Sequence, residues 1–248
     1  MTDQKPTIVL VHGAFAESAS WNGVIAQLQE HGVNVVAVAN PLRSLAGDAA
    51  YVRDVIASVG GPVVLVGHSY GGMVITEAAA QNSAVVGLVY AAAFVPETGQ
   101  SAFDLSTSAP GSTLGDALAA YPVASGGNEF AIRPELFHHQ FAADVADSEA
   151  ALMAATQRPV TEAALSEGLP TSQPAWQSIP SWFVFGDQDL NIPVAVHRAG
   201  AERAASRGTR EIAGASHAIS VSQPEAVVAT IVDAAKSYVA SLTETVSD

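Results

Sequence analysis

The chain has no cysteine among its 248 residues. This absence excludes disulfide bonds, zinc–thiolate sites, iron–sulfur clusters and cysteine nucleophiles, and it fits a reducing compartment. Basic residues are also scarce, with 10 Lys and Arg against 24 Asp and Glu, which gives a net charge of −14. So acidic a chain repels phosphate backbones and anionic lipids. We therefore expect neither a nucleic acid nor a membrane surface as a partner.

No leader peptide or membrane span is predicted. The opening MTDQKPTIVLVHG has no basic region followed by a long apolar stretch, so we expect no secretory signal and a cytoplasmic location. The apolar run at residues 85–95 (VVGLVYAAAFV) is too short to cross a bilayer and is typical of a buried strand. With 49% hydrophobic and 14% charged residues, the chain has the composition of one large globular domain.

Short apolar runs alternate with helical patterns along much of the chain. Strands are predicted at residues 7–11, 33–38, 62–66, 85–91, 181–185 and 209–212. Helices are predicted at residues 21–31, 48–59, 70–81, 194–206 and 224–242. Most of the strands are apolar nearly throughout, as are strands that are covered on both faces. The sequence therefore predicts an α/β fold with a doubly wound parallel sheet.

The alternation stops between residues 95 and 179. This stretch contains the clusters SAPGS, SGGNE and EGLPTSQP and helix-like pieces at 134–145 and 149–157, but no convincing strand. We interpret residues 95–179 as a small helical cap that lies over one end of the sheet. Residues 1–94 and 180–248 form the core, and the whole chain is one domain.

The strongest chemical signal is Gly67-His68-Ser69-Tyr70-Gly71, which has the pattern G-x-S-x-G between a predicted strand and a predicted helix. A serine at such a sharp turn presents its hydroxyl away from the sheet, and the glycines give room where the helix crowds the strand. The backbone N–H of Tyr70 is then a donor to a developing oxyanion. Ser69 is our candidate nucleophile.

A serine nucleophile needs a base, and His217 is the histidine that follows a late strand and precedes the last helix. The other six include His197, which we expect on the surface of a helix. The acid should follow the preceding strand, where Asp187 and Asp189 compete. The residues alone leave both aspartates open. A glycine turn after the first strand, at Gly13, could supply a second backbone donor.

Five segments together resemble the α/β-hydrolase superfamily: VLVHGAF, VGHSYGG, LVYAAAFVPE, FGDQDLNIP and GASHAIS. Within it the chain resembles bacterial relatives of plant methylesterases and hydroxynitrile lyases. The resemblance implies about six parallel strands in the order 2-1-3-4-5-6, without the extra N-terminal hairpin of larger members. Its G-x-x-D-x-x-I-P motif selects Asp189 as the acid, and its oxyanion donors fall on Ala14 and Tyr70.

These residues predict a serine hydrolase that cleaves carboxylic esters of small apolar molecules through an acyl-enzyme, with no cofactor and no metal. One alternative is a hydroxynitrile lyase. The lyases resembled carry threonine at the position of Gly13 and lysine at that of Ala218, and both departures count against it. Another alternative is a small-molecule receptor on a hydrolase fold. The oligomeric state stays open, with a homodimer as one option.

The substrate pocket is expected to be mostly hydrophobic. Candidate substrate-binding residues are Phe15 and Phe94 of the core and Phe137 and His138 of the cap. The aromatic rings among them could equally belong to the protein core.

Overall fold

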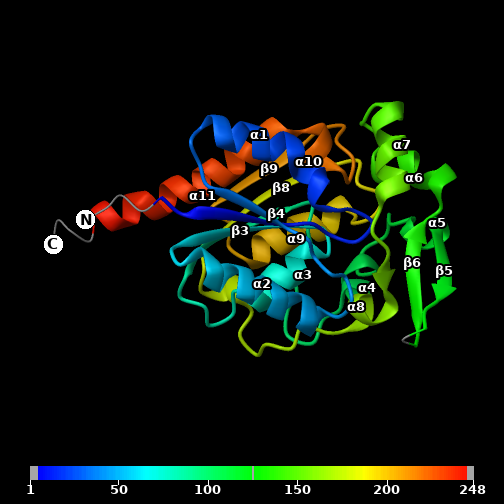
Figure 1. The fold of residues 1–248 in the computed structure, drawn as a ribbon, viewed down its shortest axis with the longest axis horizontal. Helices are drawn as coiled ribbons and strands as arrows, with labels where there is room; N and C mark the ends of the chain where they lie inside the picture. The colour runs from blue at the N-terminus through cyan, green and yellow to red at the C-terminus, as the bar shows by residue number, and fades with distance from the viewer. Residues whose placement is uncertain (1–4, 125, 245–248) are drawn as a thin grey trace.

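The computed structural model describes residues 5–124 and 126–244; the remaining parts of the predicted core and cap lie outside the described residues. A six-stranded sheet forms the centre (Figure 1). Its strands are β1 (Thr7–Val11), β2 (Val35–Val38), β3 (Val63–His68), β4 (Val85–Ala91), β8 (Ser181–Gly186) and β9 (Gly208–Ile212). All pair in parallel in the order β2-β1-β3-β4-β8-β9, which confirms the predicted order.

Helices cover both faces of this sheet, which explains why its central strands are apolar on both sides. They are η1 (Ser18–Trp21), α1 (Asn22–Glu30), α2 (Leu45–Val59), α3 (Gly71–Ala78), α9 (Val194–Arg203), α10 (Ile219–Ser222) and α11 (Pro224–Glu244). Figure 1 shows α1 and α11 on one face and α2 and α3 on the other. The doubly wound α/β class predicted from the alternating pattern is therefore confirmed.

Helix α11 ends the described chain. By length and mean hydropathy, its residues Pro224–Thr243 could cross a membrane. In this fold Val227, Ile231 and Ala234 are fully buried, and the helix packs against β3, β4, β8 and α1. The apolar stripe on α11 is thus used to cover the sheet.

Most of residues 95–179 lies beside the carboxyl ends of the strands (Figure 1), and the last residues of this segment lead back to the start of β8. They contain the helices α4 (Ala102–Ser106), α5 (Leu114–Ala117), α6 (Pro134–Phe141), α7 (Asp147–Thr156), α8 (Glu162–Ser166) and η2 (Ala175–Gln177). The loops that follow β1 and β2 reach this segment, because Phe15 N–H donates to Arg158 O and Thr161 N–H donates to Leu42 O.

The expectation that this segment contains no strand is wrong. The strands β5 (Leu118–Pro122), β6 (Asn128–Ile132) and β7 (Val160–Thr161) form a three-stranded antiparallel sheet. They are short, and β5 and β6 have few β-branched residues, so neither composition nor alternation marks them. Gly126 and Gly127, both with positive φ, lie between β5 and β6, where only a loop was expected.

Candidate active site

Ser69 lies at the turn between β3 and α3. Its φ of 55° falls in the left-handed region, which a residue with a side chain adopts at an energetic cost. Its backbone is held on both sides, since Ser69 N–H donates to Ala92 O at 3.1 Å and Ser69 O accepts from Phe94 N–H at 3.2 Å. The loop that follows β4 therefore stabilises the strained turn.

Two glycines allow this turn to form. A Cβ atom at Gly72 would lie 2.2 Å from Phe94 O. A Cβ atom at Gly13 would lie 2.6 Å from both Ser69 Cβ and His68 O, and 3.1 Å from Tyr70 N. Such distances are far below van der Waals contact. The loop after β1 thus places its backbone directly against the turn at Ser69, and only glycine fits there.

Two backbone donors beside Ser69 are unused. Within the part of the chain that the structure describes, the N–H groups of Ala14 and Tyr70 donate no hydrogen bond. Both residues are buried. Buried backbone donors are nearly always paired, so two unpaired ones near this turn are available to a bound group. The Tyr70 side chain is anchored separately, because its hydroxyl donates to Asp48 Oδ2 at 2.9 Å.

His217 lies in the loop after β9, and its Nδ1 contacts Asp189 Oδ2 at 2.7 Å. Asp189 is 5% exposed, and its Oδ1 accepts from the N–H groups of Asn191 and Ile192 at 2.8 and 2.9 Å. Asp187 instead accepts a hydrogen bond from the backbone of Gly214, with 2.7 Å between Gly214 N and Asp187 Oδ1. The structure therefore pairs His217 with Asp189 and leaves Asp187 to brace the histidine loop.

Hydrogen bonding keeps the Asp189 carboxylate ionised. Burial by itself raises the pKa of Asp189, but the positive charge of His217 and the hydrogen bonds from His197 and His217 outweigh it, so the pKa lies well below its usual range. A carboxylate in this state can orient an imidazole and stabilise the imidazolium that forms when it takes up a proton.

Two more histidines are buried around the site. His68 Nε2 contacts the backbone oxygen of His217 at 2.9 Å, and the two rings lie 4.7 Å apart. Burial, then the charge of His217, lowers the pKa of His68 to about 3. Burial lowers the pKa of His12 to about 4, although its hydrogen bond to Gly13 acts the other way. Both side chains are therefore neutral at neutral pH and support the surrounding backbone.

His197 was expected on the surface, and this prediction is wrong. The residue is 2% exposed, and its Nε2 contacts Asp189 Oδ2 at 3.0 Å. The helical pattern of α9 is weakly amphipathic, so periodicity does not show which face is buried. His197 lies eight residues after Asp189, about one turn into the helix that follows the acid loop, and this spacing is the signal in the sequence that could have indicated the contact.

The cap also reaches His217 through α6. Phe141 packs edge-on against the His217 ring, with ring centroids 4.9 Å apart, and its carbonyl oxygen accepts from Ala218 N–H at 3.0 Å. Ser216 bonds to Asp144 of the cap. Sequence reasoning did not single out Phe141 for this role, because a contact between segments so distant in the chain leaves no local pattern.

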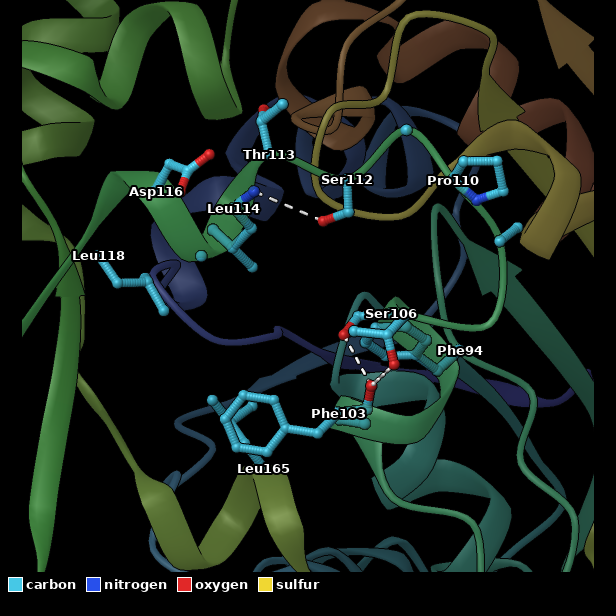
Figure 2. A pocket seen from close by; sticks show the side chains of 15 residues that line it. Phe94, Phe103, Ser106, Pro110, Ser112, Thr113, Leu114, Asp116, Leu118 and Leu165 are labelled. Carbon is cyan, nitrogen blue, oxygen red and sulfur yellow. Dashed lines mark hydrogen bonds between the residues drawn. The ribbon is translucent and has the colours of Figure 1, made fainter.

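A cavity of about 350 Å³ opens between α4, α5 and α8 of the cap. Figure 2 shows the side chains of Phe94, Phe103, Leu114 and Leu118 around it. Phe94 connects it to the turn at Ser69, since its N–H donates to Ser69 O. Of the four predicted substrate-binding residues, this cavity includes Phe94.

The other three lie elsewhere. Phe15 lines a second cavity of about 320 Å³ against α7. Phe137 is fully buried and stacks on Phe141 at 5.0 Å. His138 bonds to Val145 O and pairs with Asp147, within the cap. Among the described residues, no cluster of three or more His, Asp or Glu side chains has an arrangement that could hold a metal ion.

Known proteins resemble the chain over most of its length. The profile described as the alpha/beta hydrolase family matches residues 8–230. The chain is 29% identical to alpha/beta hydrolase nvfD of Aspergillus novofumigatus, over 93% of this chain and 97% of that protein. It is 26% identical to putative methylesterase 11, chloroplastic, of Arabidopsis thaliana, over 88% of this chain and 61% of that protein.

A solved structure, that of polyneuridine aldehyde esterase, superposes with a TM-score of 0.78 at 22% identity. The superposition covers 93% of this chain and 99% of that one. At this level of identity the likeness concerns the fold.

Replacing Gly13 tests the contact between the loop after β1 and the turn at Ser69. In Gly13→Ala the new Cβ would displace Ser69 or the Tyr70 amide, so we expect labelling of Ser69 by a fluorophosphonate to slow by about 100-fold, the effect of losing one oxyanion donor. Gly61→Ala is the control, because a Cβ there meets nothing within 4 Å. Equal labelling rates for the two variants would contradict the contact.

The buried neutral histidines predict a pH-dependent stability. The pKa values of His68 and His12, about 3 and about 4, lie below the 6.5 of an unfolded chain. Stability is therefore fully present above pH 6.5 and falls as the pH drops, because the unfolded chain takes up protons first. The slope is up to about 1.4 kcal/mol per pH unit for each histidine.

Urea unfolding between pH 6.5 and 5 measures this slope before carboxylates titrate. We expect His68→Gln and His12→Gln to flatten it, whereas His139→Gln, an exposed residue, leaves it unchanged. A slope that is the same in all three variants would refute the assignment.

Proposed function

The chain belongs to the alpha/beta hydrolase family, and on that premise we propose that it hydrolyses carboxylic esters with Ser69 as nucleophile, His217 as base and Asp189 as acid. The observation that carries this proposal is the 2.7 Å hydrogen bond between His217 and a buried carboxylate, in a protein whose strained serine turn lies beside two unpaired backbone donors. The methylesterase and the esterase that the chain resembles support the ester class.

The mechanism follows from these groups. His217 Nε2 takes the proton of Ser69 Oγ while that oxygen attacks the ester carbonyl carbon, and Asp189 stabilises the resulting imidazolium. The N–H groups of Ala14 and Tyr70 donate to the oxyanion of the tetrahedral intermediate. His217 then gives its proton to the departing alcohol, which leaves an acyl-enzyme. A water molecule repeats the sequence and releases the acid.

The cavity beside Phe94 favours small apolar esters. It is lined mainly by apolar side chains, and Asp116 is the only ionisable residue among the described residues that line it. A volume of about 350 Å³ lies at the lower end of the range for small-molecule sites. The net charge of −14 also disfavours anionic substrates. Methyl and short-chain esters of apolar acids are therefore the substrates that we propose.

The site is poorly suited to a hydroxynitrile lyase. A threonine at position 13 would bring its Cβ to 2.6 Å from Ser69 Cβ. Ala218, which follows the base, is buried and supplies no positive charge for a departing cyanide. A receptor that uses the same fold would bind small molecules without turnover, and catalysis distinguishes it from an enzyme.

A panel of chromogenic esters of graded acyl length tests the proposed function. We expect wild type to hydrolyse short apolar esters and Ser69→Ala to lose about 10⁶-fold in kcat, because removing the nucleophile abolishes acylation. A mandelonitrile cleavage assay runs alongside. Cyanide release that depends on Ser69, with no hydrolysis of any ester, would overturn the proposal in favour of a lyase.

Substitution of the two aspartates separates their roles. Asp189→Asn removes the charge that supports His217, and we expect kcat to fall by about 10⁴-fold while the protein remains folded. Asp187→Asn keeps an acceptor for Gly214 N–H and should retain most activity. Steady-state kinetics with circular dichroism measures both variants, and the opposite ranking would assign the acid to Asp187.

A further inference from the structure

One oxygen of the Asp189 carboxylate is shared by two histidines. Oδ2 lies 2.7 Å from His217 Nδ1 and 3.0 Å from His197 Nε2. The side chains of both histidines are 1% exposed and that of Asp189 is not exposed, so these hydrogen bonds are made away from solvent. Because an ionised carboxylate only accepts hydrogen bonds, His197 must carry its hydrogen on Nε2 and donate it.

The His197 ring is held in a fixed orientation. It stacks on Phe185 of β8, with ring centroids 4.9 Å apart and planes 15° from parallel. Its backbone lies in the second turn of α9, a helix that packs on β8. The donor is therefore positioned by the packing of α9 on the central sheet.

With its four hydrogen bonds, Asp189 has little freedom to rotate. Asn191 and Ile192 hold Oδ1, and His197 holds Oδ2 on the side not used by His217. A carboxylate fixed at one oxygen alone could still tilt and lengthen its bond to His217. The hydrogen bond from His197 also withdraws negative charge from Oδ2. The remaining negative charge on that oxygen attracts the proton on His217 less strongly.

We propose that His197 is a positioning residue, which fixes Asp189 Oδ2 in line with His217 and limits how strongly that carboxylate holds the proton on His217. This inference rests on the proposed function, in which His217 acts as the base. It extends the Ser69–His217–Asp189 set by a fourth residue that does not touch the substrate.

The charged and titratable groups around Asp189 determine the expected pH effect. They are His217 of the histidine loop, His197 of α9 and His68 of β3, and Glu211 of β9 and its partner Arg198 lie near His197. Without the His197 donor, Asp189 would hold the proton on His217 more strongly. The acid limb of the kcat/KM profile would then move to higher pH.

Two variants separate the effect of the His197 hydrogen bond from that of its ring stacking. His197→Phe keeps a planar ring for stacking on Phe185 and removes the N–H group, whereas His197→Gln keeps an N–H donor at similar reach. We expect the Phe variant to lose about 10- to 100-fold in kcat, the effect of one hydrogen bond to a charged group. Its KM should change less than twofold, and its acid limb should move to higher pH. The Gln variant should recover most of the kcat and the wild-type pH profile.

The control is His31→Phe, since His31 is exposed at the end of α1, and we expect it to leave kcat and the pH profile unchanged. A Phe variant that is folded by circular dichroism and has the wild-type kcat and acid limb would overturn the proposal. So would a Gln variant as impaired as the Phe variant.

Proton NMR of the unreacted protein gives a readout that needs no substrate. The proton between His217 Nδ1 and Asp189 should resonate far downfield in wild type, stay there in His197→Gln and shift in His197→Phe. If no ester is hydrolysed by wild type, the proposed function fails, while this resonance still tests the positioning. If the Phe variant does not fold, the spectrum of the Gln variant is the test. A displaced His217–Asp189 proton resonance in His197→Gln would overturn the proposed role of His197.

Discussion

The burial of the Asp189 carboxylate is the constraint on which the candidate site depends. An ionised carboxylate is stable away from water only where hydrogen bonds replace its hydration. Here the donors are the N–H groups of Asn191 and Ile192 and the rings of His197 and His217. They come from the acid loop, from α9 and from the loop after β9. The parallel pairing of β8 and β9 brings these segments to one end of the sheet, so the fold and the charge stabilise each other.

Burial also affects the protonation of the histidines that surround Asp189. His68 and His12 are kept neutral by burial, with pKa values of about 3 and about 4. They therefore add no positive charge that would repel a protonated His217, and their hydrogen bonds to backbone oxygens hold the loops around it. Of the four histidines near the site, His197 and His217 bond to Asp189. Only His217 of these two lies in the loop after β9, whose backbone contacts His68 next to Ser69. This arrangement fits the proposed role of His217 as the base.

The central sheet and the tight turn at Ser69 could be predicted because their signals are local. Strands covered on both faces are apolar throughout, and the glycines around Ser69 mark a place where backbones nearly touch. The strands β5, β6 and β7 could not be predicted, because short and partly exposed strands need neither β-branched residues nor alternation. The burial of His197 depends on how α9 packs on β8, which no local pattern encodes. The positions of Phe137 and His138 also follow from packing within the cap, and not from chemistry near Ser69.

The central claim is that Ser69 becomes acylated by an ester. Mass spectrometry of the protein, quenched in the pre-steady state with an activated short-chain ester and digested, measures this directly. The account predicts one acyl group, carried by the peptide that contains Ser69, and no adduct in Ser69→Ala. An active wild-type protein with no adduct, or with the adduct on another residue, would contradict it.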